Sequence, residues 1–127
     1  MIFGRELCRW LWAKLLQKEL DKMVEFRNGA TMRKDKNKPG PSGMSRNHAF
    51  SLPDSWGGID CLLKIPDMAV IRQMKLELGG KQLLAFSTEE FDKRAQPVFD
   101  DLRIQSFSFS SVWDTFQTML PFLFAGY

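Results

Sequence analysis

The sequence contains few of the side chains that bind metals or form disulfides. Its 127 residues include one histidine, His48, and two cysteines, Cys8 and Cys61. A zinc site needs four nitrogen or sulfur ligands, and these three residues are too few and unsuitably spaced. Because the cysteines have no CxxC spacing and no secretory leader is recognisable, we expect reduced, buried thiols in an intracellular protein, either cytoplasmic or nuclear. No metal and no other cofactor is predicted.

Long apolar runs are also missing. The two most apolar windows, residues 11–16 and 119–125, are far shorter than the roughly 20 residues that a helix needs to cross a bilayer. The glycine pairs at 57–58 and 79–80 are not followed by the Lys and Ser or Thr of a phosphate loop. We therefore predict no integral membrane association and no nucleotide loop.

Residues with catalytic chemistry form only weak patterns. Asp60, Asp67 and Glu77, with Lys75 or Lys81, are of the types that hold Mg²⁺ near a scissile phosphate in nucleases. However, Lys75 and Glu77 fall in a predicted helix, two residues apart and on different faces. We interpret these side chains as helix caps and surface groups. A small metal-dependent nuclease is therefore the least favoured alternative, and no catalytic residue is predicted.

Charge is plentiful but unevenly distributed. Residues 1–46 carry eleven Lys or Arg against five Asp or Glu, residues 47–86 are balanced, and residues 87–127 carry three against six. Most of the excess lies in residues 28–47, which are rich in Gly, Pro and Asn and hold one acid, Asp35. Proline and glycine disfavour regular structure, so this segment is predicted to be a flexible basic linker. Its cations are Arg33, Lys34, Lys36, Lys38 and Arg46.

The basic segment has two interpretations. It is either a solvated connection or an arm that contacts the phosphates of a nucleic acid, with sequence-independent and salt-sensitive binding. No aromatic residue is interleaved with the cations, so base stacking is not expected. The acidic C-terminal third of the chain is an alternative, internal partner for the same cations.

The N-terminal region predicts one long helix with two apolar faces. Residues 2–26 contain no proline, and Asn28 and Gly29 are signals for a helix end. One helix cannot turn opposite faces to one core. Either the helix is well buried at its start, or its second stripe contacts a partner protein or a second copy, or it lies on a membrane surface. The first stripe is Phe3, Leu7, Trp10 and Leu11, and the second is Trp12, Leu16, Leu20 and Met23.

The rest of the chain alternates strand and helix patterns. Apolar runs and alternation predict strands at 59–65, 81–86 and 103–110. We therefore predict an α/β or α+β fold, with a small three-stranded sheet and alternating helices behind the long helix and the flexible basic linker. The expected organisation is an N-terminal helix at 1–27, the linker at 28–47 and a single mixed α/β domain at 48–127.

Three helices are predicted between and after these strands. Pro66 and Asp67 start the first, which the glycine pair ends. Ser87 with Glu90 has the form of a capping box for the second, which Pro97 is expected to kink or split. Ser111 is expected to cap the third, and Pro121 to end it.

The C-terminal end is crowded with aromatic residues, seven of them within residues 107–127. The final segment PFLFAGY has no charge, so it either folds back over the sheet or docks into a partner through Phe122 and Phe124. With the second stripe of the helix, these residues are the predicted protein contacts. We predict a non-catalytic adaptor or regulatory subunit that binds a partner protein or forms a homo-oligomer, with a nucleic-acid-binding regulator as the alternative.

Overall fold

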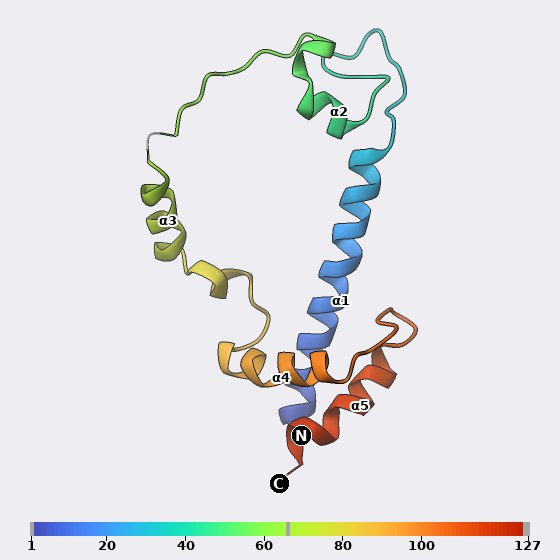
Figure 1. The fold of residues 1–127 in the computed structure, drawn as a ribbon, viewed down its shortest axis with the longest axis vertical. Helices are drawn as coiled ribbons and strands as arrows, with labels where there is room; N and C mark the ends of the chain where they lie inside the picture. Colours follow the sequence, from blue (N-terminus) through green and yellow to red (C-terminus); the bar gives the residue numbers. More distant parts are fainter. Residues whose placement is uncertain (1, 66, 126–127) are drawn as a thin grey trace. The chain divides into compact units, whose positions relative to one another are not determined.

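The protein is all-α in the residues that the structure describes. The computed structural model describes residues 2–65 and 67–125, and only the backbone of residues 2 and 3. Among these residues, the one strand-like pairing is an isolated antiparallel bridge between Thr31 and Ser45. The α-helices (Figure 1) are α1 (Ile2–Gly29), α2 (Arg46–Ser51), α3 (Met68–Glu77), α4 (Glu89–Asp101) and α5 (Val112–Phe124). Two short 3-10 helices are η1 (Pro53–Trp56) and η2 (Gly80–Leu84).

The predicted three-stranded sheet, and with it the α/β or α+β class, is wrong. Residues 59–65 have no regular structure, and Ile59 within them is 92% exposed. Residues 81–86 fall largely in η2, and residues 103–110 form turns and bends. Alternation of apolar and polar residues fits a strand, but a strand also needs a neighbour to take its backbone hydrogen bonds. Within the part of the chain that the structure describes, none of the three segments has such a neighbour.

Helices α3 and α4 lie where the sequence predicts them. Asp67 caps α3, because its carboxylate accepts a hydrogen bond of 2.8 Å from the backbone N–H of Ala69. The cap of α4 is Thr88, one residue later than the predicted Ser87. The Thr88 hydroxyl accepts a bond of 3.2 Å from the N–H of Phe91. The predicted contribution of Pro66 to the start of α3 lies outside the described residues.

Two of the predicted effects of proline are absent: Pro97 does not split α4, and Pro121 does not end α5. Helix α4 runs through Pro97, and α5 runs through Pro121 to Phe124. In α5 the neighbours Met119 and Leu123 are buried, so packing offsets the hydrogen bond that the proline removes. Ser111 does precede α5, but its hydroxyl makes no cap and donates to a loop carbonyl instead.

The chain divides into two compact units. The first contains residues up to Lys18 and those from Asp67 onward, and the second contains the residues between, starting at Glu19. Helix α1 therefore contributes its N-terminal half to the first unit and its C-terminal half to the second. The domain boundaries expected from the sequence stay a prediction.

The main core lies in the first unit, where α4 and α5 pack beside the N-terminal half of α1 (Figure 1). The first apolar stripe of α1 faces this core; its member Phe3 lies outside the described side chains. In the second stripe, Trp12 is half-buried against the core, whereas Leu16 is 48% exposed. The early part of α1 is thus buried on more than one side. The buried core residues are Leu7, Trp10, Leu11, Leu15, Phe91, Ala95, Phe107, Val112, Met119 and Leu123.

Aromatic rings join the three helices of this core. Trp10 on α1 meets Phe99 on α4 edge-on, with ring centroids 5.7 Å apart, and Phe99 meets Phe107 at 5.2 Å. Trp12 meets Trp113 on α5 at 6.0 Å. Edge-to-face pairs contribute about 0.5–1.5 kcal/mol beyond the burial of their surface. The turn after α4 is therefore part of the core, which explains why Phe107 is buried without a sheet.

The second unit has much less buried surface. Among its described residues only Ala49 is a buried hydrophobic, and the indole N–H of Trp56 donates a 2.9 Å bond to the carbonyl oxygen of Ala49. Phe50 on the same short helix is exposed. Cys61 is also exposed, and Cys8 of the first unit is only partly buried, so the prediction of two buried thiols is wrong.

The core assignment predicts unequal effects for two leucines of α1. Leu11→Ala removes a fully buried side chain and is expected to cost about 2–5 kcal/mol of unfolding free energy, because a cavity remains. Leu16→Ala, on the same helix but half-exposed, is the matched control and is expected to cost about 1 kcal/mol or less. Urea unfolding followed by tryptophan fluorescence measures both; equal losses would contradict the assignment.

Candidate partner-binding cleft

The residues predicted for partner contact are divided between the two units: Leu20 and Met23 belong to the second, and the others, Trp12, Leu16, Phe122 and Phe124, belong to the first. Trp12 and Phe124 are partly buried against the core, and Phe122 is exposed. The other three, Leu16, Leu20 and Met23, are each about half-exposed along α1. Of the predicted anion contacts, four line a hollow in the second unit, and Lys36 does not: they are Arg33, Lys34, Lys38 and Arg46.

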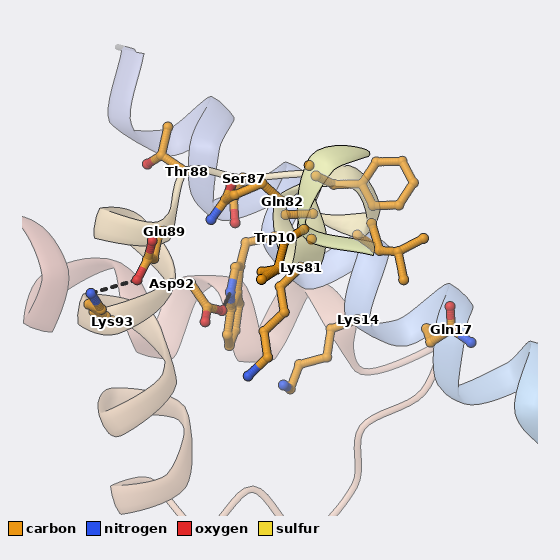
Figure 2. A pocket seen from close by; sticks show the side chains of 17 residues that line it. Trp10, Lys14, Gln17, Lys81, Gln82, Ser87, Thr88, Glu89, Asp92 and Lys93 are labelled. Carbon is orange, nitrogen blue, oxygen red and sulfur yellow. Dashed lines mark hydrogen bonds and ion pairs between the residues drawn. The ribbon is translucent and has the colours of Figure 1, made fainter. Parts of the chain in front are cut away.

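A cleft of about 720 Å³ opens in the first unit (Figure 2). Helix α1 lines it with Trp10, Ala13, Lys14 and Gln17, and the remaining wall comes from residues 76–89 and the first turns of α4. Binding sites for ligands are typically about 300–1,000 Å³, so the cleft is large enough for a small molecule or part of a peptide. The sequence does not predict this cleft, because the apolar pattern of residues 81–86 favours a strand.

Trp10 and Lys14 form the floor that α1 contributes. The indole Nε1 of Trp10 donates a 2.7 Å hydrogen bond to Oδ1 of Asp92 on α4. The Nζ of Lys14 donates a 2.8 Å bond to Oε1 of Gln96 and lies 4.8 Å from the centre of the Trp10 ring. A cation over an aromatic face is attracted by the ring quadrupole. These contacts fix the side chains of α1 against α4. Within the described residues, Lys14 forms no salt bridge.

The rim of the cleft carries further charge. Lys93 and Glu89 form a salt bridge of 2.7 Å across one turn of α4 (Figure 2). The hydrogen bond and the charge of Lys93 lower the pKa of Glu89, with a smaller lowering by Lys81, and Glu89 raises the pKa of Lys93. Within the described residues, Lys81 has no ion pair. In Figure 2 the side chains of Lys81 and Lys14 extend in the same direction. The cleft therefore presents two cations that form no salt bridge within the described residues, and the charge of Lys81 is partly offset by Glu89.

The opposite wall is apolar and exposed. Leu84 is 82% exposed and Phe86 is 77% exposed, and Leu76 at the end of α3 also lines the cleft. Helix α3 has no buried residue. We call α3 and η2, residues 68–86, the apolar hairpin. Its large apolar side chains that are about half-exposed or more are Met68, Val70, Met74, Leu76, Leu78, Leu83, Leu84 and Phe86.

The acidic residues considered for a nuclease have structural roles. The carboxylate of Asp60 accepts a 2.8 Å bond from the backbone N–H of Leu62, and Glu77 accepts a bond from the Gln73 amide. Among residues 2–65 and 67–125, no group of three or more His, Cys, Asp or Glu side chains is arranged to hold a metal ion. No helix in the described part of the chain is long and apolar enough to span a bilayer.

A comparison with known proteins finds no match to this chain among protein families, curated proteins or solved structures. A functional assignment therefore depends on the chain's own residues.

The bond between Trp10 and Asp92 predicts a selective effect of substitution. Asp92→Ala leaves a buried indole N–H without its acceptor and is expected to lower the unfolding free energy by about 1–3 kcal/mol. Asp92→Asn keeps an acceptor oxygen, so its loss is expected to be less than that of Asp92→Ala. Chemical unfolding of the three proteins measures the difference. If Asn were as damaging as Ala, the hydrogen bond would not be the cause.

Proposed function

We propose that this protein is a non-catalytic binding protein whose cleft and apolar hairpin receive an apolar, acidic segment of a partner protein. The main observation in support of this proposal is that α3 has no buried residue, although it contains several large apolar side chains. Contiguous exposed apolar surface on a protein marks a site of interaction.

The length of α3 supports this proposal. The helix has 10 residues, and isolated helices shorter than about 12–15 residues are marginal in water. Its Asp67 cap contributes about 1 kcal/mol, which does not make a lone short helix stable. Most of the stability of a helix in a protein comes from packing of its apolar face. For α3 a partner's surface would supply that packing.

The charge of the cleft favours an acidic partner segment. Asp92 is engaged by Trp10, and Glu89 is engaged by Lys93. Lys14 and Lys81 then stay as the cations available to a ligand, beside the apolar side chains of Leu84 and its neighbours. A segment with apolar anchors and one or two carboxylates would match both features. Because the apolar surface continues along α3 beyond the cleft, a protein segment covers more of it than a small molecule would.

Selection of peptides from a phage-displayed random library on the immobilised full chain tests this proposal. The recovered peptides are expected to combine apolar residues with Asp or Glu. Their affinity is expected to fall at least about tenfold for a triple variant of the hairpin, because each anchor loses its apolar contact. That variant is Leu76→Gln, Leu84→Gln and Phe86→Gln.

The second unit provides a matched control for the same assay. Phe50, Ile59 and Leu63 are as exposed as the hairpin residues, so their triple replacement by Gln changes overall hydrophobicity equally. Peptide binding is expected to survive in this control. Recovered peptides that are basic, or that bind both triple variants as well as the original chain, would contradict the proposal. Light scattering of the free protein shows whether a second copy acts as the partner.

A further inference from the structure

We propose that the basic loop, residues 31–46, which follows α1 and ends at the first residue of α2, is a binding site for the phosphates of a nucleic-acid backbone, separate from the partner-binding cleft. The loop belongs to the second unit, whereas the cleft belongs to the first. Its cations surround one hollow, of about 590 Å³, lined by Met32, Arg33, Lys34, Asp35, Lys38 and Arg46.

Hydrogen bonds close the base of the loop. The backbone N–H of Met32 donates a 2.9 Å bond to the carbonyl oxygen of Met44, and the N–H of Gly43 donates a 3.1 Å bond to that of Met32. These bonds adjoin the antiparallel bridge between Thr31 and Ser45. The two ends of the loop are thereby held together, which lowers the entropy cost of bringing its cations to one ligand.

A second set of bonds shapes the tip of the loop. The hydroxyl of Ser42 accepts from the backbone N–H of Asp35 at 3.2 Å and donates to the Asp35 carbonyl oxygen at 3.1 Å. The Asp35 carboxylate accepts a 2.9 Å bond from the N–H of Asn37. The single acid of the hollow is therefore engaged by the backbone, and its charge is partly offset by that donor.

Arg46 ties the loop to the end of α1. Its Nη1 donates a 2.9 Å bond to the carbonyl oxygen of Arg27, in the last turn of that helix. A guanidinium has five N–H donors in a planar fork, so this bond leaves others for a ligand. Arg46 is thus a positioned cation at the wall of the hollow, and all four cations are exposed.

The hollow carries an excess of positive charge. Four cations face one carboxylate, and none of the four forms a salt bridge within the described residues. Like charges gathered in one concave surface repel one another and attract anions. Arg and Lys both bind phosphate oxygens, Arg through paired N–H groups and Lys as a point charge.

The lining favours a phosphate backbone over other anionic partners. No aromatic side chain borders the hollow, so bases have no stacking surface, and the expected binding is independent of sequence. Met32 is the one apolar residue in the lining, which provides little surface for the apolar side chains of a phosphopeptide. The exposed Lys36 outside the hollow extends the charge to a further phosphate along a strand.

Fluorescence anisotropy with short labelled single strands of oligo-dT and oligo-dA tests the proposal on the full chain. Both strands are expected to bind with similar affinity, and the logarithm of the binding constant is expected to fall with that of the salt concentration by about 0.7 per phosphate contact. Arg33→Gln, Lys34→Gln and Lys38→Gln together are expected to weaken binding at low salt by about tenfold or more and to reduce the slope by about 2. Gln removes the positive charge and keeps a polar group at the end of each side chain.

Two matched controls separate the site from overall charge. Arg5→Gln, Arg72→Gln and Lys75→Gln together remove the same charge from exposed positions outside the loop and are expected to change binding little. Gly43→Ala keeps every cation but places a side chain at φ +73°, against the Lys34 stem, and is expected to weaken binding. Gly29→Ala, at a position with open space and no positive φ, is its control.

Several outcomes would overturn the proposal. These are no binding to either strand at low salt, equal loss in both triple-Gln variants, or Gly43→Ala binding as tightly as the original chain. Tighter binding of a labelled phosphopeptide, or of vesicles containing anionic lipid, than of the single strands would also overturn it, because the site would then belong to a different ligand class. Circular dichroism of each variant shows that the helices are retained.

Discussion

The packing of the N-terminal half of α1 against α4 and α5 is the constraint on which the first unit depends. Leu7, Leu11 and Leu15 are fully buried there, on one side of a single helix. Burying a leucine side chain contributes about 1.5–3 kcal/mol, so these three residues are a large part of the stability of a small domain. Trp10 adds a hydrogen bond and an aromatic contact to α4. The beginning of the chain is thereby held to its last third.

The same packing decides which apolar surface is left over. The described core draws its residues from α1, α4, α5 and the turn at Phe107, and none from α3 or η2. The apolar hairpin is linked to this core through the chain and through the wall of the cleft. Surface of this kind is costly to keep in water, which is the physical basis for proposing that a partner covers it. The second unit exposes apolar side chains too, among them Phe50, Ile59 and Leu63, and it also contains the cations of the basic loop.

The sequence predicted the helices better than the fold. Helical spacing, the Asp67 cap and the terminal glycines located α1 and α3 because these signals are local. The sheet was wrong because a strand depends on distant pairing partners, which alternation at Phe107 and Phe109 does not specify. Ring packing against Phe99 buries Phe107 in a turn instead. The predicted effects of Pro97 and Pro121 on their helices were wrong for a related reason: tertiary packing can outweigh the local preference of a proline.

For the candidate sites too, the sequence indicated local features but not the tertiary arrangement. The cations of the basic loop were evident from composition, but the hollow that gathers four of them depends on backbone bonds between Met32, Gly43 and Met44. The cleft was not predicted at all. Its lining combines Trp10 and Lys14 with residues more than sixty positions later in the chain. Local sequence patterns do not indicate which distant residues lie close together in the fold.

Amide hydrogen exchange of the free protein tests the central claim most directly. If α1, α4 and α5 form the stable core and α3 lacks packing, the backbone amides of α3 will exchange at least about a hundredfold faster than those around Leu11, Ala95 and Met119. Slow exchange is then expected only for amides whose hydrogen bonds break when the whole core unfolds. Amides of α3 protected as strongly as those of α4 and α5 would contradict the account.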